Sequence, residues 1–197
     1  MNSFKHTGGF TLESGFTLPE IEIAYTTYGK LNADKSNVVW VCHALTANSD
    51  AADWWDGVVG SNHVIDPEKY FIVCANILGS CYGSTGPLSV NPVTKKPYYN
   101  NFPLLTIRDM VKAHILLRHH LGIEKIFLLM GGSMGGYQAM EWCVMENTVI
   151  ENLLLLATSA SESAWGIATH TAQRLSLEAD TTWNTASANA GAKGLKA

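Results

Sequence analysis

The sequence predicts an α/β protein with a mostly parallel sheet and flanking helices. Short, almost wholly apolar runs recur at 38–42, 70–75 and 126–130. Runs that are apolar on both faces are typical of central strands in a parallel sheet that helices cover. Helical patterns follow the last two of these runs, and the alternation of strand and helix favours right-handed crossovers between parallel strands.

The other elements can be placed along the chain from local patterns. In residues 17–28 apolar and polar side chains partly alternate, so a half-exposed strand is expected before the three central ones. Thr106 and Asp109 have the spacing of a capping box at the start of a helix, and Gly122 stands where a C′ glycine would end that helix. A second helix and a further apolar strand, 149–157, are expected after the third central strand.

Composition narrows the class of protein. Of the 197 residues, 47% are hydrophobic and 15% are charged, which is typical of a globular domain. The net charge of −4 gives no electrostatic reason to expect nucleic acid or an anionic membrane as a partner. No apolar run could span a bilayer and the first residues lack the apolar region of a secretion signal, so a cytoplasmic protein is expected. The four cysteines form no CxxC pair and are expected to be structural thiols, with no metal site.

The strongest signal for chemistry is the run GGSMGG at 131–136, which directly follows the strand at 126–130 and precedes a helix. This strand–turn–helix context is what makes the GxSxG pattern indicate a nucleophile elbow. A serine on so tight a turn has strained backbone angles, and side chains two positions to either side would collide, so glycines are required there. We therefore predict that Ser133 is a catalytic nucleophile and that the N–H of Met134 is an oxyanion donor.

A phosphate-binding turn is the alternative for such a glycine-rich run, but the sequence has neither the Lys-Ser/Thr of a P-loop nor the GxGxxG spacing. A second loop, HALT at 43–46, follows the strand at 38–42, where this architecture supplies its other oxyanion N–H. Leu45 is the expected donor. His43 precedes the serine, whereas this fold runs Ser, then acid, then His, so His43 is interpreted as a residue that shapes the loop.

Several segments together resemble the homoserine O-acyltransferase (homoserine O-acetyltransferase) family of the α/β-hydrolase superfamily. The matching pieces are HALT at 43–46, NILGSCYGSTGP at 76–87, FP at 102–103 with TIRDMV at 106–111, and GGSMGG with EW at 141–142. The segment at 76–87 is the most specific of them. The similarity extends from about Phe10 to Asp180, so an α/β-hydrolase-type sheet is the expected fold.

The resemblance implies transfer of an acyl group, with acetyl expected, from an acyl-CoA to the side-chain hydroxyl of L-homoserine, an early step toward methionine. Ser133 would form an acyl-serine and release CoA, and homoserine would then attack the acyl-serine, which is ping-pong covalent catalysis. Such chemistry uses acyl-CoA as co-substrate and needs no bound cofactor or metal. The resemblance also implies a homodimer for the complete protein, and residues 79–87 are expected to form a pocket wall at the carboxyl end of the sheet.

Two other functions fit the same residues. A carboxylesterase or related serine hydrolase would use the same elbow, and consumption of acyl-CoA that depends on homoserine would distinguish the transferase from it. A non-catalytic domain that keeps the elbow as a scaffold is the third possibility, and it would turn over no activated ester.

A serine triad also needs an acid and a base after Ser133. Glu162 and His170 come in the right order, but they lie eight residues apart in a segment of helical character, so they are not assigned as a dyad. The family's own acid and histidine lie after a helical lid, and neither is carried over to this chain. We therefore expect 1–160 to be the N-terminal part of the core and 161–197 to be the start of the lid. We also expect the sheet to be incomplete at its C-terminal side and the chain alone to be inactive.

The remaining histidines and tryptophans of interest are expected to be structural. His114, His119 and His120 share a predicted helix without an i, i+4 pair, so a polar helix face is expected rather than a metal site. Trp54 and Trp55 are expected to pack the edge of the domain.

Overall fold

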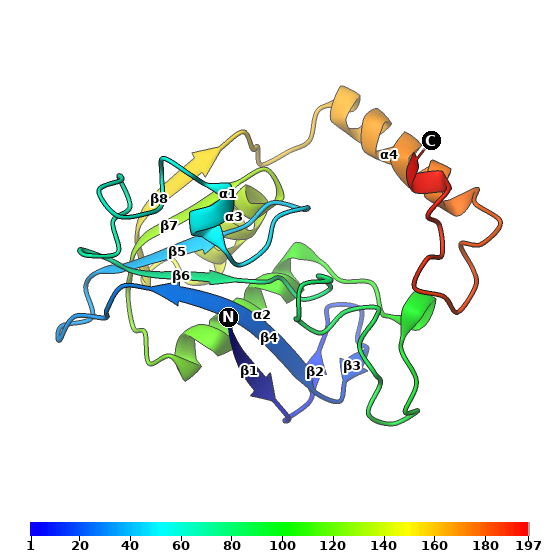
Figure 1. The fold of residues 1–197 in the computed structure, drawn as a ribbon, viewed down its shortest axis with the longest axis horizontal. Coiled ribbons are helices and arrows are strands. Elements are labelled where there is room, and N and C mark those ends of the chain that lie inside the picture. The colour runs from blue at the N-terminus through cyan, green and yellow to red at the C-terminus, as the bar shows by residue number, and fades with distance from the viewer. Residues whose placement is uncertain (197) are drawn as a thin grey trace. The chain divides into compact units, whose positions relative to one another are not determined.

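The computed structural model describes residues 1–196, which divide into two compact units (Figure 1). The first unit comprises 1–85 and 104–159, and the second comprises 86–103 and the chain from Ala160 onward. Within the described residues no helix combines the length and the apolar character needed to cross a membrane. The same residues hold no group of His, Cys, Asp and Glu side chains that could bind a metal ion.

A six-stranded sheet forms the centre of the first unit, in the order β1-β4-β6-β5-β7-β8. The strands β6, β5, β7 and β8 run parallel to one another. Their bounds are Phe71–Ala75, Val38–Cys42, Ile126–Gly132 and Ile150–Leu156. These are the apolar runs of the sequence with their ends displaced by two residues at most, so the predicted mostly parallel α/β sheet is confirmed.

The amino-terminal part of the sheet differs from the prediction. β1 (Asn2–His6) pairs antiparallel with β4 (Ile21–Tyr28), and β4 pairs antiparallel with β6. The segment 17–28 is therefore not one half-exposed strand. Its first residues form β3 (Thr17–Leu18) in a hairpin with β2 (Phe10–Thr11), and β4 is an inner strand with a largely buried first half. The cause is β1, which covers the side of β4 that would otherwise be the edge of the sheet.

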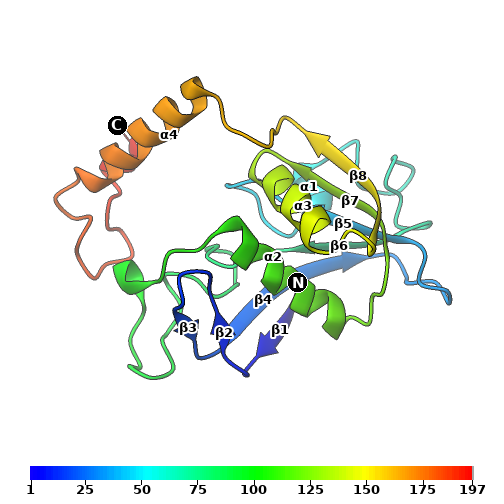
Figure 2. The ribbon, with the colours of Figure 1, turned by 180° about the vertical axis from the view of Figure 1, so that it is seen from behind.

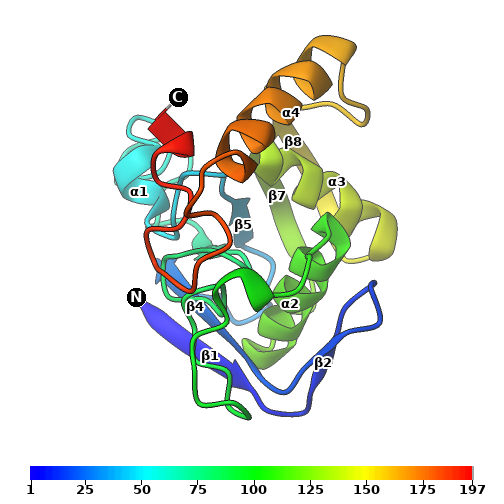
Figure 3. The same ribbon diagram turned by 90° about the vertical axis from the view of Figure 1, so that its right-hand side faces the viewer.

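Two helices, α2 (Ile107–His120) and α3 (Met134–Met145), cover one face of the sheet (Figures 2 and 3). Trp40 of β5 packs edge-on against Trp142 of α3, with the ring centroids 5.0 Å apart, and both side chains are fully buried. The helix α3 is thereby fixed directly above the strand that precedes the 43–46 loop.

The helix α2 begins and ends as the sequence predicts. The side chain of Thr106 accepts from the N–H of Asp109, and the Asp109 carboxylate accepts from the N–H of Thr106, which completes a capping box. At the other end Gly122 has φ 65°, a left-handed conformation that glycine adopts without strain.

The prediction that His114, His119 and His120 form a polar face of α2 is wrong for His114. His114 is fully buried, with its ring stacked on Trp142 and edge-on to Trp40, both at centroid distances of 5.9 Å. The reason is its position on the helix, which is the side that faces the sheet. His119 and His120 are exposed, as expected.

The other face of the sheet carries the short helix α1 (Ala51–Trp54). Trp54 and Trp55 stack on each other with ring centroids 5.1 Å apart, and they pack against the buried cluster that contains Val39 and Met130. These two tryptophans therefore have the packing role that the sequence predicts, but they pack over inner strands on one face of the sheet.

The strand β8 is the last strand of the sheet within the described residues, where it pairs only with β7. Its leucines are half-exposed: Leu153, Leu154 and Leu156 keep 40%, 39% and 41% of their surface accessible. Apolar side chains beside a row of unpaired backbone groups are the arrangement expected from the sequence at this side of the sheet.

All four cysteines are free thiols. Cys42 and Cys74 are buried in β5 and β6, and burial raises the pKa of both. A buried thiol with a raised pKa is unreactive, which agrees with the structural role predicted for these two residues.

The second unit folds its tail back onto the end of its helix. Asp180 accepts hydrogen bonds from the N–H groups of Thr182, Lys193 and Gly194, and these bonds, that from Thr182 above all, lower its pKa to about 2. Its described elements are one helix and two 3₁₀ turns: α4 (Ala164–Glu178), η1 (Tyr99–Asn101) and η2 (Gly194–Lys196).

Candidate active site

Ser133 lies at the junction of β7 and α3, where the sequence predicts the elbow. Its backbone has φ 52° and ψ −124°, the residue is exposed, and its side chain makes no capping hydrogen bond to α3. A positive φ in a non-glycine residue costs roughly 1–3 kcal/mol and is typical of residues held for function. Within the described residues, the strained turn thus presents a hydroxyl without a hydrogen-bond partner at the carboxyl edge of the sheet.

Close backbone contacts require the glycines of the elbow. A Cβ atom on Gly131 would overlap the carbonyl of Gly135, and a Cβ atom on Gly135 would overlap the carbonyl of Cys42. The sequence predicts both requirements. It does not predict the third, at Gly136, where a Cβ atom would overlap the side chain of Thr158.

The two predicted oxyanion donors lie on segments that touch each other. The contact of Gly135 with Cys42 places the start of α3 against the end of β5, directly before the 43–46 loop. Within the described residues neither the N–H of Leu45 nor that of Met134 has a hydrogen-bond acceptor. Unpaired N–H groups are what an oxyanion hole requires, and Leu45 and Met134 stay the predicted donors.

His43 is fully buried behind this loop and bonds to its backbone. Its Nδ1 donates to the carbonyl of Ala44 at 2.8 Å, and its Nε2 accepts from the N–H of Ile77 at 3.1 Å. Burial lowers the pKa of the imidazole, so the ring is neutral at neutral pH. Because both ring nitrogens are occupied, His43 has no free site for a proton from Ser133, and its bond to Ala44 agrees with the prediction that it shapes the loop.

Two buried polar residues that the sequence analysis missed lie behind the elbow. Gln138 of α3 donates from Nε2 to the carbonyls of Met134 and His43, at 3.2 and 3.4 Å. His114 donates from Nε2 to Gln138 Oε1 at 3.1 Å, and burial lowers its pKa to about 4. No pattern of residues marks Gln138. His114 does share the helical spacing of Val111 and Leu117, the apolar side of the predicted helix, and this spacing could have indicated its burial.

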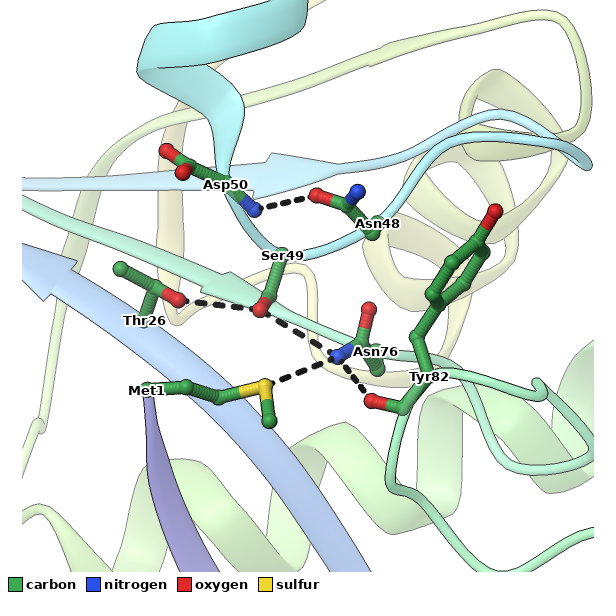
Figure 4. Close-up of a pocket in the computed structure, with 7 residues that line it drawn as sticks. All are labelled: Met1, Thr26, Asn48, Ser49, Asp50, Asn76 and Tyr82. Carbon is green, nitrogen blue, oxygen red and sulfur yellow. Dashed lines mark hydrogen bonds between the residues drawn. The ribbon is translucent and has the colours of Figure 1, made fainter.

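A pocket of about 320 Å³ opens at the carboxyl end of β6 (Figure 4). Asn76 fixes one wall, since its Nδ2 donates to the carbonyl of Tyr82 at 2.6 Å and to Ser49 Oγ at 3.2 Å. Tyr82 belongs to the 79–87 loop, which is the predicted pocket wall. In sheet order β6 is two positions from β7, so roughly 10 Å separates the pocket's strand from the strand that ends at the elbow. The lining residues are Met1, Thr26, Asn48, Ser49, Asp50, Asn76 and Tyr82.

Glu162 and His170, the residues with the chain order of a triad acid and base, bond to each other in the second unit. His170 Nδ1 lies 2.6 Å from Glu162 Oε1, and the histidine side chain is 62% exposed. His170 is on α4, as expected. An exposed pair of this kind stabilises a helix by at most about 1 kcal/mol.

The sequence matches the alpha/beta hydrolase fold family over residues 37–193. The homoserine O-acetyltransferase of Cyclobacterium marinum is 50% identical over 186 residues, which are 94% of this chain and 53% of that protein. Among solved structures, homoserine O-acetyltransferase from Bacillus anthracis has a TM-score of 0.90 at 28% identity, over 99% of this chain and 57% of the other. The acetyl esterase MekB has a TM-score of 0.86 at 29% identity, over 99% and 56%.

The chain spans about half the length of the curated relatives that it matches. The shared part contains the parallel strands, the elbow and the 43–46 loop. On this sequence match and this agreement of folds, the chain belongs to the alpha/beta hydrolase fold family and is similar in sequence to the homoserine O-acetyltransferases.

Proposed function

We propose that this chain supplies the nucleophile and the oxyanion hole of a homoserine O-acetyltransferase. The observation that carries the proposal is Ser133, held at a strained elbow in a chain that is 50% identical to the Cyclobacterium marinum enzyme. The reaction moves an acetyl group from acetyl-CoA to the side-chain hydroxyl of L-homoserine, for methionine biosynthesis. Both substrates are small molecules.

The geometry of the elbow supports a reaction in two covalent steps. Ser133 Oγ attacks the thioester carbonyl, its proton passes to a base, and the C–S bond breaks to release the CoA thiol. The oxyanion that forms on the carbonyl oxygen accepts hydrogen bonds from the N–H groups of Leu45 and Met134. The hydroxyl of homoserine then attacks the acyl-serine, the ester of homoserine leaves, and Ser133 regains its proton. Because a thioester is already activated, these steps need no metal or prosthetic group.

Transfer rather than hydrolysis requires that the acceptor hydroxyl take the place of water. The 79–87 loop is suited to this task, because Tyr82 lines a pocket at the same edge of the sheet as the elbow. In the proposed enzyme this loop limits the access of water to the acyl-serine.

A serine esterase is the second candidate, because the acetyl esterase MekB shares the fold at 29% identity. An esterase would form the same acyl-serine and pass the acyl group to water. The two functions therefore differ only in the second step.

The test measures CoA release from acetyl-CoA with and without L-homoserine, and identifies the product by mass spectrometry. The chain alone should react slowly, because both nitrogens of His43 are occupied and an unassisted serine hydroxyl is a poor nucleophile. The assay is therefore repeated with the part of the Cyclobacterium marinum enzyme outside the matched residues added as a separate polypeptide. Homoserine-dependent release with formation of O-acetylhomoserine supports the transferase. CoA release at the same rate with and without homoserine would favour the esterase. No CoA release from the chain alone or with the added polypeptide would contradict both functions.

A further inference from the structure

We propose that His43 is a positioning residue that aims the N–H of Leu45 into the oxyanion hole, and that Gln138 ties the same loop to the start of α3. The proposal rests on the nucleophile assigned above but not on the identity of the acyl acceptor. It concerns residues that do not touch the substrate and act through the backbone.

The hydrogen bonds of His43 specify one form of its ring. A carbonyl oxygen can only accept, so Nδ1 carries the proton that it shares with Ala44 at 2.8 Å. An amide N–H can only donate, so Nε2 is unprotonated where it faces Ile77 at 3.1 Å. The neutral Nδ1–H tautomer is the one that satisfies both partners.

The bond to Ala44 determines the direction of the Leu45 N–H. The carbonyl of Ala44 and the N–H of Leu45 belong to one planar peptide group and point in opposite directions. This carbonyl accepts from His43 Nδ1 at 2.8 Å and from the N–H of Ala47 at 3.1 Å. With the oxygen held on one side, the Leu45 N–H points to the other side, where it has no acceptor within the described residues. Hydrogen bonds to a carbonyl also polarise its peptide group, which strengthens the N–H as a donor.

Gln138 connects the segments that carry the two donors. Its Nε2 donates to the carbonyl of Met134 at 3.2 Å and to that of His43 at 3.4 Å, so one amide group bonds to both segments. The side chain is fully buried and is itself held by His114 through Oε1. An oxyanion hole works because its donors are placed before the reaction, and losing one donor typically costs about a hundredfold to a thousandfold in rate.

The test compares His43→Asn with His43→Gln. Asparagine places its Nδ2 where Nδ1 of the histidine lies and can keep the bond to Ala44, whereas glutamine places its terminal atoms near Nε2 and keeps only the partner at Ile77. The probe is a fluorophosphonate, in which Ser133 Oγ forms a bond to phosphorus, fluoride leaves, and the serine proton passes to solvent. The labelling rate is followed by intact mass.

We expect His43→Asn to label within about threefold of the unaltered chain, and His43→Gln to label about tenfold to a hundredfold more slowly at equal thermal stability. A residue that only fills space would give no such split, so equal rates for the two variants, or a faster His43→Gln, would overturn the proposal. Each rate is measured for the chain alone and with the part of the Cyclobacterium marinum enzyme outside the matched residues added, and failure of the unaltered chain to label in both arrangements would remove the nucleophile and the proposal with it. A negative result in the homoserine assay would leave this test unaffected.

A measurement without variants covers the case in which neither variant folds. The ¹⁵N shifts of the His43 ring report which nitrogen carries the proton, and the proposal requires a protonated Nδ1 and an unprotonated Nε2. In the phosphonylated chain the amide proton of Leu45 should shift downfield as it bonds to the phosphoryl oxygen. The opposite tautomer, or an unchanged Leu45 amide, would contradict the proposal.

Discussion

The Cα atom of Gly135 lies directly against the carbonyl oxygen of Cys42, so the first turn of α3 and the end of β5 meet backbone to backbone. This contact brings the residue after the nucleophile and the loop after β5 to the same edge of the sheet. The proximity of the two predicted oxyanion donors therefore depends on residue 135 being a glycine, which has no Cβ atom.

The first prediction concerns this contact. Gly135→Ala would drive a Cβ atom into a backbone carbonyl that cannot rotate away, and overpacking of this kind typically costs about 1–3 kcal/mol in the free energy of unfolding. Urea denaturation measures the loss. Gly132→Ala is the matched control, since its Cβ would lie 3.5 Å from the carbonyl oxygen of Leu156, an ordinary contact. Equal stability of the two variants would show that the elbow is less tightly packed than the structure indicates.

The second prediction concerns the nucleophile. Ser133→Ala should abolish the acyl adduct that forms when the chain is incubated with acetyl-CoA or p-nitrophenyl acetate, because the substitution removes the oxygen that would carry the acyl group. Intact-mass spectrometry followed by peptide mapping detects the adduct. Ser14→Ala, at an exposed position, serves as the control and should acylate normally. An adduct of unchanged yield in Ser133→Ala would place the nucleophile elsewhere.

The strands and the elbow are predictable from sequence because their causes are local. A strand buried on both faces must be apolar throughout, as 38–42 and 126–130 are, and a turn as tight as 131–136 excludes side chains at fixed positions. The capping box at Thr106 is local for the same reason, since both of its partners lie within one helical turn.

The parts that the sequence does not predict depend on distant partners. The residues of β1 have no strong alternation, and they form a strand because β4 offers an open edge for pairing. His114 looks like one of several polar helix residues until Trp40, Trp142 and Gln138 enclose it from other elements. Burial of a polar group becomes favourable only when its partner is present, and the pairing is a property of the fold.

The third prediction concerns His170. Both His170→Ala and Glu162→Gln should leave the rate of Ser133 acylation by p-nitrophenyl acetate within about twofold of the unaltered chain, because a general base must lie within about 2.6–3.2 Å of the proton it takes. Glu162 lies 2.6 Å from His170 Nδ1, so the two variants test one pair, and His170 is on the helix α4 rather than on a loop that follows a strand of the sheet. Stopped-flow release of p-nitrophenol measures the rate. A loss of tenfold or more that is shared by both variants would instead establish the pair as a working dyad.

The last prediction concerns pH and His114. Its folded-state pKa of about 4 lies below the ordinary value of 6.5 because the ring is buried. The unfolded chain therefore binds a proton at a higher pH than the folded one, and stability is greatest above pH 6.5 and falls as the pH drops toward 4. The loss attributable to this residue is on the order of 3 kcal/mol.

Urea denaturation at several pH values measures this loss of stability. His114→Gln keeps a donor for Gln138 but does not titrate, so its stability should depend less steeply on pH between 6.5 and 4. His120→Gln, at an exposed position of the same helix, should keep the full dependence. An unchanged slope in His114→Gln would mean that His114 binds its proton at the same pH in the folded and unfolded chains, which would contradict a buried neutral ring bonded to Gln138.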